Sequence, residues 1–356
     1  MEKVLTWEEG QLGNLMKMVR AGVRVGSPVS SAASRHILVA TTWRSGSSFL
    51  ADLLNYYPGT FYYFEPLHYY SQLKKDLREK VQEPMDFLHS LFICSFTSTN
   101  NGYLRHLAQH EVLMAKKNTR LWNSCSTVLP KETLCFLPKY LNSVCPLYPI
   151  KLIKTVRFRV AKVEALLNDP DMNLKVILLV RDPRGVYNSR RSGQVTSWCK
   201  NAACADPQTG CKDLSADLKA AERLAASYPS AITLVRYEDL ALQPEKRARG
   251  ILQFLDLPWH ATMDRYIGNH TSKEKVIQSK LTGKMETVKD TFGTSRNSTA
   301  NAFAWRQKLG LGSVREIQEV CREPMARLGY RTVDSLEELD GGELMLENTA
   351  QEVWRT

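Results

Sequence analysis

The fold of this chain is decided by the stretch Ile37-Leu-Val-Ala-Thr-Thr-Trp-Arg-Ser-Gly-Ser-Ser-Phe49. Apolar residues run into a short loop with one glycine and three serines, and apolar residues at helical spacing continue to Leu54. The pattern predicts a strand, a tight loop and a helix. Backbone N–H groups at a helix N-terminus favour an anion, and Arg44 adds a full positive charge. We therefore expect a phosphate or sulfate group to bind at this loop.

The loop is not a Walker A motif. That motif requires an additional preceding glycine and a lysine directly after Gly46, and neither is present. The simpler interpretation is an ordinary strand-turn-helix connection whose helix begins with a serine cap.

The composition is that of a basic globular protein. Of 356 residues, 43% are apolar and 24% are charged, which is enough for a sizeable core. An excess of 48 basic over 37 acidic residues gives a net charge of +11 and favours a polyanionic ligand. We do not expect nucleic acid, because no helix-turn-helix, zinc-finger or RNP-type aromatic signature accompanies the charge.

Eight cysteines favour disulfides. Their number is even, and Cys199, Cys204 and Cys211 lie in a polar segment typical of a stapled loop. A zinc site is the alternative, but no C-x-x-C pair or nearby histidine cluster supports it, so we expect no metal. The glycosylation sequons at Asn269 and Asn297 fit a lumenal glycoprotein.

Strand-like and helix-like patterns alternate along the chain. Strands are expected at 60–65, 151–158, 174–180 and 231–239, and helices from Arg184, over 245–255 and over 314–328, with a mainly helical insertion at 72–115. This alternation predicts an α/β fold, a parallel sheet with helices on both faces. We divide the chain into a lead segment 1–35, a domain 36–331 and a flexible tail 332–356. No run of eighteen uncharged apolar residues predicts a membrane span.

Charged residues stand at the ends of two expected strands. Glu65 precedes Pro66 at the end of one, and Lys154 and Arg157 lie three apart near the end of another. The carboxyl edge of an open α/β sheet faces the ligand. We expect Lys154 and Arg157 to hold an anionic or sugar acceptor, the alternative being solvated strand ends.

A second anion motif follows the strand-like run 174–180, in Arg181-Asp-Pro-Arg-Gly-Val-Tyr-Asn-Ser189. With a helical rise of about 1.5 Å per residue, the Ser189 hydroxyl returns toward an anion that Arg181 holds. Arginine provides a forked clamp and serine a neutral donor. The alternative is that Arg181 pairs with Asp182.

Together these residues resemble the Golgi carbohydrate sulfotransferases that sulfate the 6-hydroxyl of galactose, N-acetylglucosamine or N-acetylgalactosamine. The loop from Thr42 to Phe49 is similar to their 5′-phosphosulfate loop, and Arg181 with Ser189 to their 3′-phosphate motif. The resemblance runs from about His36 to Arg331 and includes the landmarks Phe64-Glu-Pro-Leu67, Tyr237-Glu-Asp-Leu240, Trp305-Arg306 and Leu328-Gly-Tyr330.

The resemblance implies a P-loop-like sulfotransferase fold, with 3′-phosphoadenosine 5′-phosphosulfate (PAPS) as the donor and no metal. The implied acceptor is a keratan, chondroitin or N-acetylglucosamine-terminated glycan. The family is lumenal in the Golgi and normally has a type II membrane anchor, which is not seen in this sequence. The implied donor-binding residues are Arg44, Ser45, Gly46, Ser47, Ser48, Phe49, Arg181, Ser189, Tyr237 at the adenine and Arg296 over the 3′-phosphate.

The reaction needs a base and a clamp for negative charge. We expect Glu65 to take the proton of the acceptor hydroxyl, with a pKa raised by partial burial beside aromatic residues. Arg44 is assigned electrostatic stabilisation only, because a guanidinium with a pKa above about 12 does not donate its proton.

Three alternatives are weighed against this interpretation. A tyrosyl-protein sulfotransferase shares the donor, but the Glu-Pro-Leu and Trp-Arg stretches favour the carbohydrate group. A kinase-like phosphoryl transferase requires magnesium ligands, and the P-loop lysine is missing. A non-catalytic basic module that binds sulfated glycans has no need of a second phosphate motif.

Overall fold

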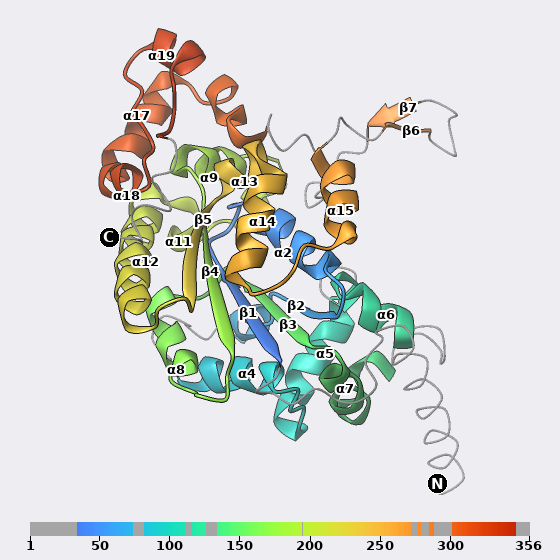
Figure 1. Ribbon diagram of the computed structural model, residues 1–356. Helices are drawn as coiled ribbons and strands as arrows, with labels where there is room; N and C mark the ends of the chain where they lie inside the picture. The colour runs from blue at the N-terminus through green and yellow to red at the C-terminus, as the bar shows by residue number, and fades with distance from the viewer. Residues whose placement is uncertain are drawn as a thin grey trace, which may run out of the picture. The chain divides into compact units, whose positions relative to one another are not determined.

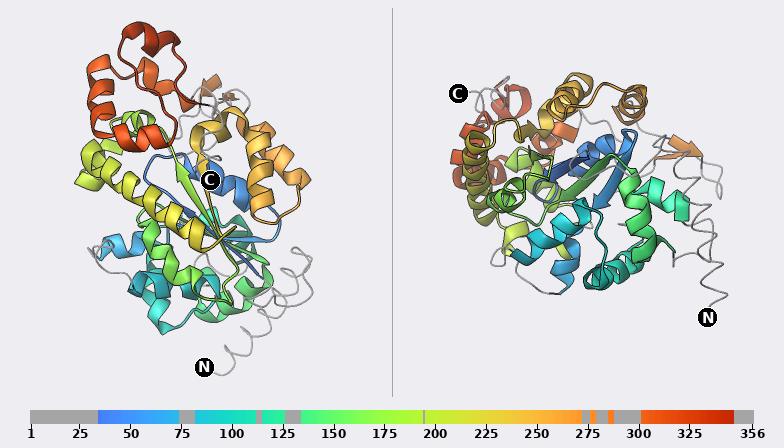
Figure 2. Two further views of the ribbon diagram at one scale, coloured as in Figure 1. Left: turned by 60° about the vertical axis from the view of Figure 1, so that its left-hand side comes forward. Right: turned by 60° about the horizontal axis from the view of Figure 1, so that its bottom comes forward.

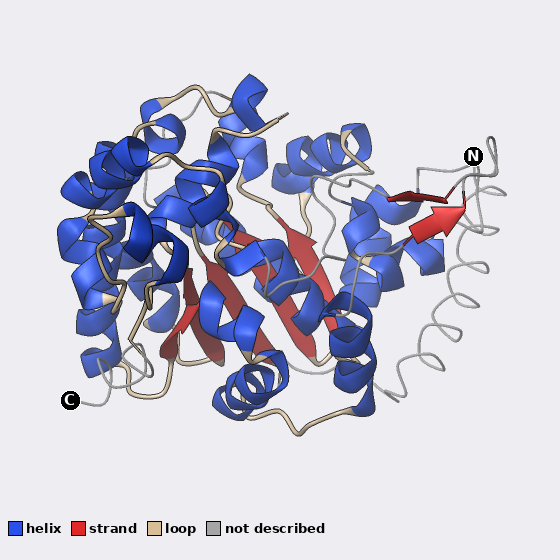
Figure 3. Cartoon of the chain, turned by 90° about the horizontal axis from the view of Figure 1, so that it is seen from above, coloured by secondary structure: helices blue, strands red, loops and turns tan. Residues whose placement is uncertain are grey.

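A computed structural model describes residues 34–73, 82–111, 115–125, 134–193, 195–271, 276–278, 285–287 and 301–346. They form a five-stranded parallel sheet in the order β2-β3-β1-β4-β5, with helices on both faces (Figure 3). The strands are β1 (Arg35–Ala40), β2 (Thr60–Phe64), β3 (Ile150–Thr155), β4 (Leu174–Val180) and β5 (Ile232–Arg236). The α/β fold predicted from the alternating patterns is confirmed.

The chain forms two compact units. The first unit contains the residues up to Val39, Leu54–Phe158 and Lys162–Val176. The second unit contains Ala40–Leu53, Arg159–Ala161 and the residues from Ile177 onward. Helix α2 (Ser47–Tyr56) begins in the second unit.

In the first unit, β2 and β3 pair in parallel, with Thr60 opposite Ile150 and Phe64 opposite Lys154. This register brings the carboxyl ends of the two strands to the same edge. The helices drawn in cyan to green, between residues 82 and 144, lie together in both views of Figure 2. The helices are α3 (His68–Gln72), α4 (Gln82–Phe92), α5 (Asn101–Gln109), α6 (Thr119–Cys125), α7 (Pro138–Val144) and α8 (Glu164–Leu167), with single 3₁₀ turns η1 (Ser98–Asn100), η2 (Ala115–Lys117), η3 (Leu134–Phe136) and η4 (Cys145–Leu147). The turn η5 (Val160–Val163) follows β3.

In the second unit, β4 runs into α9 and β5 into α13. Helices α9 and α12 both begin with an Asp-Pro pair, in which the aspartate side chain accepts from the first backbone N–H groups and proline occupies the first turn. Helix α12 lies beside α18 (Figure 1). The disulfide Cys211–Cys321 joins α12 to the residue between α17 and α18. The helices are α9 (Pro183–Arg190), α10 (Val195–Trp198), α11 (Ala202–Ala205), α12 (Pro207–Ser227), α13 (Tyr237–Leu242), α14 (Pro244–Phe254), α15 (Ala261–Thr271), η6 (Ala304–Gln307), α17 (Leu311–Val320), α18 (Arg322–Arg327) and α19 (Leu336–Gly341). Strands β6 (Val276–Gln278) and β7 (Met285–Thr287) form a separate antiparallel pair.

A small core at the end of the chain gathers around Trp305. Its side chain is fully buried and packs in one cluster with Val314, Val333, Leu339 and Leu344. Residues 332–346 therefore fold against this cluster, although their sequence has no periodic core pattern.

All eight cysteines are paired. The disulfides are Cys94–Cys145, Cys125–Cys135, Cys199–Cys204 and Cys211–Cys321. The prediction of disulfides is confirmed. In the part of the chain that the structure describes, no helix has the length and hydrophobicity to cross a membrane.

Candidate functional site

The loop between β1 and α2 is anchored by buried hydroxyl groups. The Thr41 hydroxyl lies 2.6 Å from the Leu179 carbonyl oxygen and 2.6 Å from the Ser45 hydroxyl. Ser45 is fully buried, and the Thr41 hydroxyl that it contacts fixes the loop to the end of β4. Contact with an anion then falls to the backbone N–H groups of the loop and of the first turn of α2.

That first turn contains three of the predicted donor-binding residues. Ser47 and Phe49 are buried, and Ser48 is partly exposed. The Phe49 ring lies 6.0 Å from the ring of Tyr266, whose hydroxyl donates to the Phe49 carbonyl. Phe49 thus fixes α2 by packing, and the serines stand where the helix begins.

Gly46 cannot be replaced by a residue with a side chain without a change in the loop. Its φ is +88°, and a Cβ atom built there would lie 2.2 Å from Cδ2 of Tyr237. The Tyr237 ring therefore packs directly on the loop, and the Arg181 guanidinium lies 4.6 Å from the centre of that ring.

Two arginines and a serine meet at the loop. Arg44, whose φ is +68°, donates from Nε to the Ser189 hydroxyl over 2.9 Å. Arg181 donates to the Arg44 carbonyl over 3.1 Å and to the Asn301 carbonyl over 2.9 Å. The second predicted anion motif therefore lies beside the first, and Ser189 contacts Arg44 within it.

The alternative for Arg181, an ion pair with Asp182, is not observed. Asp182 caps α9 through Arg184 N and receives the guanidinium of Arg184 at 2.8 Å. Both side chains of this pair are fully buried.

Three of the four landmarks of the resemblance, at 237–240, 305–306 and 328–330, meet in one buried network of the second unit. Glu238 accepts from Asp182 N and, over 2.7 Å, from the Tyr330 hydroxyl. Burial and the charge of Asp182 raise the pKa of Glu238 to about 7. The Arg184 guanidinium lies 4.3 Å from the Trp305 ring centre. These landmarks hold the segment after β4 in place.

In the first unit, the three charged residues predicted at strand ends form one cluster. Glu65 Oε1 lies 2.5 Å from Lys154 Nζ, and Oε2 lies 2.7 Å from Arg157 Nη1. Glu65 and Lys154 are 5% and 3% exposed, so neither is a solvated strand end. The Val156 N–H also points at the carboxylate.

The predicted rise in the pKa of Glu65 is wrong. Burial does raise this pKa, but the charges of Lys154 and Arg157 outweigh burial, and the pKa lies below its ordinary value. The carboxylate is therefore ionised at neutral pH. The two cations reduce the basicity of this carboxylate.

Three histidines cluster after β2. His68 Nδ1 lies 2.9 Å from His106 Nε2, and the His106 and His110 ring centres are 4.5 Å apart. Burial, then the charges of Arg157 and His106, lower the pKa of His68 to about 4, so that its ring is neutral at neutral pH. Among the residues that the structure describes, no group of histidine, cysteine or acidic side chains is arranged to hold a metal ion.

Sequence reasoning missed His106 and Arg190. His106 lies on α5, 38 residues after its partner His68, and no local pattern links them. Arg190 follows Ser189 directly, but a single arginine at a helix end carries no signal of its own. The predicted Arg296 lies outside the described residues.

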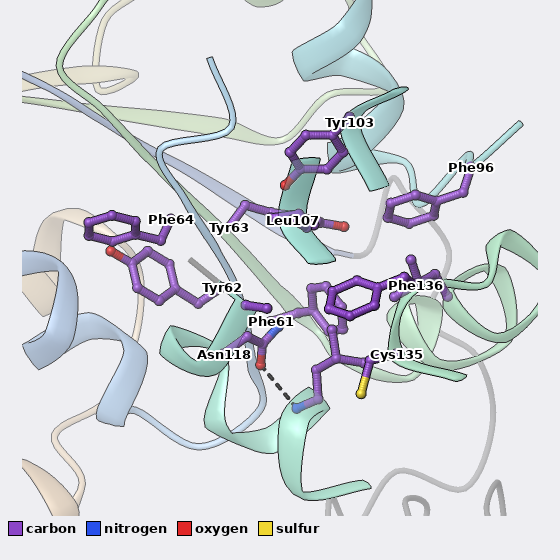
Figure 4. Close-up of a pocket in the computed structure, with 13 residues that line it drawn as sticks. Phe61, Tyr62, Tyr63, Phe64, Phe96, Tyr103, Leu107, Asn118, Cys135 and Phe136 are labelled. Carbon is purple, nitrogen blue, oxygen red and sulfur yellow. Dashed lines mark hydrogen bonds between the residues drawn. The ribbon is translucent and has the colours of Figure 1, made fainter. Parts of the chain in front are cut away.

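A cavity of about 30 Å³ lies in the first unit, lined mainly by aromatic side chains (Figure 4). Phe64 and Tyr103 contribute rings, and Asn118 contributes an amide that accepts from Leu121 N.

Comparisons with known proteins agree with the motifs. A family model described as "Sulfotransferase domain" matches residues 162–329. The chain is 31% identical to carbohydrate sulfotransferase 1 from Homo sapiens, over 85% of this chain and 81% of that protein. It is 29% identical to carbohydrate sulfotransferase 6 from Homo sapiens, over 88% of this chain and 85% of that protein. The solved "Sulfotransferase Domain from the Curacin Biosynthetic Pathway" is similar with a TM-score of 0.45 and 15% identity, over 83% of this chain and 98% of that structure.

Proposed function

Because this chain belongs to the carbohydrate sulfotransferase family, we propose that it transfers the sulfonate of PAPS to the 6-hydroxyl of a galactose or N-acetylhexosamine. The acceptor is a glycan of the keratan or chondroitin type. The observation that carries this proposal is the meeting of Arg44, Arg181 and Ser189 at a strand-loop-helix anion site.

The donor half of the reaction is assigned to the second unit. The loop N–H groups and the start of α2 bind the 5′-phosphosulfate, and Arg181 with Ser189 binds the 3′-phosphate. Negative charge grows on the bridging oxygen of the leaving phosphate as the sulfur–oxygen bond breaks. Arg44 stabilises that charge, and as a guanidinium it remains protonated throughout.

The acceptor half is assigned to the first unit. Glu65 is ionised and takes the proton of the attacking 6-hydroxyl, while Lys154 and Arg157 hold the carboxylate in one orientation. The two cations also provide donors for acceptor oxygens. Tyr237 is assigned to the adenine and Arg296 to the 3′-phosphate, as the resemblance implies.

The disulfides support an oxidising compartment. Four disulfides use every cysteine of the chain, and such bonds persist in secretory compartments. We place the enzyme in the Golgi lumen. Asn269, the sequon residue within α15, is exposed and accessible for glycosylation.

Nucleotide binding tests the donor assignment. By titration calorimetry, 3′-phosphoadenosine 5′-phosphate should bind at least tenfold more tightly than adenosine 5′-phosphosulfate, because a charge-assisted contact contributes about 1.5–3 kcal/mol. Ser189→Ala should remove part of this difference. Ser192→Ala is the matched control, because Ser192 is exposed and its hydroxyl donates to the Ser189 carbonyl. Equal affinity for the two nucleotides would contradict the assignment of the 3′-phosphate site.

A further inference from the structure

Residues 41–46, between β1 and α2, are called the anion loop here. Arg190, the last residue of α9, donates hydrogen bonds to this loop. Its Nε and Nη2 lie 3.1 and 3.0 Å from the Trp43 carbonyl oxygen, and Nη2 lies 2.7 Å from the Thr42 hydroxyl. Arg190 is only 3% exposed, and burial lowers its pKa. The groups that its guanidinium contacts are carbonyl and hydroxyl oxygens, and these neutral oxygens replace its hydration.

The same guanidinium also contacts the short loop that the Cys199–Cys204 disulfide closes, here called the disulfide loop. Arg190 Nη1 lies 2.8 Å from the carbonyl oxygen of Cys204, which is bonded to Cys199. The Trp43 side chain packs on the buried cluster formed by Cys199, Cys204 and Val195. The anion loop and the disulfide loop are therefore connected twice, once through Arg190 and once through Trp43.

The bond to the Trp43 carbonyl also sets the direction of a loop N–H group. In a trans peptide the C=O and N–H groups point in opposite directions, and the chain has no cis peptide among its described residues. With the Trp43 carbonyl held by Arg190, the N–H of Arg44 points away from Arg190. The next carbonyl, that of Arg44, is held by Arg181, which orients the N–H of Ser45 in the same manner. Successive N–H groups that face one side of a loop would form an anion-binding nest.

We infer that Arg190 is a positioning residue of the donor site and that the Cys199–Cys204 disulfide contributes to the same positioning. The disulfide fixes the Cys204 carbonyl, Arg190 bridges that carbonyl to Trp43, and the loop N–H groups are thereby aimed at the donor's 5′-phosphosulfate. The identity of this anion rests on the proposed function.

A pair of arginine variants separates positioning from stability. Arg120 in the first unit is a matched control, because it is partly buried and also donates to backbone carbonyls, among them those of Asn55 and Tyr57. Arg190→Lys should weaken 3′-phosphoadenosine 5′-phosphate binding about tenfold, which corresponds to about 1.4 kcal/mol. It should raise the KM for PAPS and leave the KM for the acceptor unchanged. Arg120→Lys should lower Tm and leave nucleotide affinity within about twofold of the parent.

A pair of disulfide variants tests the other end of the connection. Cys199→Ser/Cys204→Ser should weaken nucleotide binding several-fold, whereas Cys125→Ser/Cys135→Ser should lower only Tm. Combining the first pair with Arg190→Lys should be less than additive, because both changes interrupt one connection.

The outcomes distinguish this inference from the function on which it rests. If the parent binds the nucleotide, and Arg190→Lys and Cys199→Ser/Cys204→Ser both bind it within twofold of the parent, the positioning role is overturned and the donor assignment survives. A parent that binds no nucleotide overturns the donor assignment and this inference together.

Discussion

Replacing Glu65 with glutamine removes a buried negative charge that two cations share. The carboxylate lies 2.5 Å from Lys154 Nζ and 2.7 Å from Arg157 Nη1. Glutamine preserves the size of the side chain but leaves Lys154, only 3% exposed, without a counter-charge. Breaking a buried pair in this way costs about 3–5 kcal/mol. At about 2 °C per kcal/mol for a large domain, Tm should fall by about 6–10 °C near neutral pH.

This loss depends on pH, with a sign set by the pKa of Glu65. Burial raises that pKa, but the two cations lower it below the ordinary value. The ionised carboxylate therefore stabilises the fold above the unfolded-state pKa of about 4.3, and this stabilisation is lost as the pH falls through the folded-state pKa. The difference in Tm between parent and variant should be complete near neutral pH and should shrink in acid.

Thermal unfolding across a pH series measures both effects. Glu245→Gln is the control, because Glu245 pairs with Arg249 on an exposed helix face, and its loss should cost no more than about 1 kcal/mol. A Tm for Glu65→Gln no lower than that of the control, or a deficit that persists unchanged in acid, would refute the energetic role of this cluster.

The same variant tests the role of Glu65 as the base. On folded protein well below Tm, turnover should fall about 10²- to 10⁴-fold while donor affinity is retained. If turnover remained within about threefold of the parent, the base would lie elsewhere, and neutral His68 would be the next candidate.

Three further results are expected. Gly46→Ala should lower both Tm and nucleotide affinity, because its Cβ would lie 2.2 Å from the Tyr237 ring. Gly193→Ala is the control for backbone strain alone, because Gly193 has φ +54° and no neighbour within 4 Å of a built Cβ. Thermal unfolding and calorimetry on both variants measure the difference. Arg44→Ala should slow turnover about 10²- to 10³-fold and Arg44→Lys less, because lysine keeps the charge and loses the guanidinium fork that contacts Ser189; steady-state kinetics decide this. Thiol titration of the denatured, unreduced protein should find none of the eight cysteines reactive, and all eight after reduction.

The strands were predictable where the local pattern was complete. The run 174–180 is apolar over nearly its whole length and is followed by Arg-Asp-Pro, and the strand β4 occupies that same range. For Ser189, helical rise predicts a hydroxyl near an anion that Arg181 holds, and the structure places that hydroxyl 2.9 Å from Arg44 Nε.

The pairing of Glu65 was not predictable from local pattern. Sequence placed Glu65, Lys154 and Arg157 at strand ends, but only the register of β2 against β3 shows that the carboxylate faces both cations. When Lys154 and Arg157 are left out, burial beside aromatic rings predicts a raised pKa for Glu65, whereas its pKa is lowered. The histidine cluster was missed because it depends on how α5 packs in the first unit.

Transfer of a labelled sulfonate to a defined oxygen tests the central claim most directly. The enzyme is incubated with radiolabelled PAPS and a panel of keratan, chondroitin, N-acetylglucosamine and tyrosine-containing peptide acceptors, and the labelled position is determined after digestion. We predict label on the 6-oxygen of a galactose or N-acetylhexosamine. Label on tyrosine, or no transfer to any glycan by an enzyme that binds the nucleotide, would contradict the account.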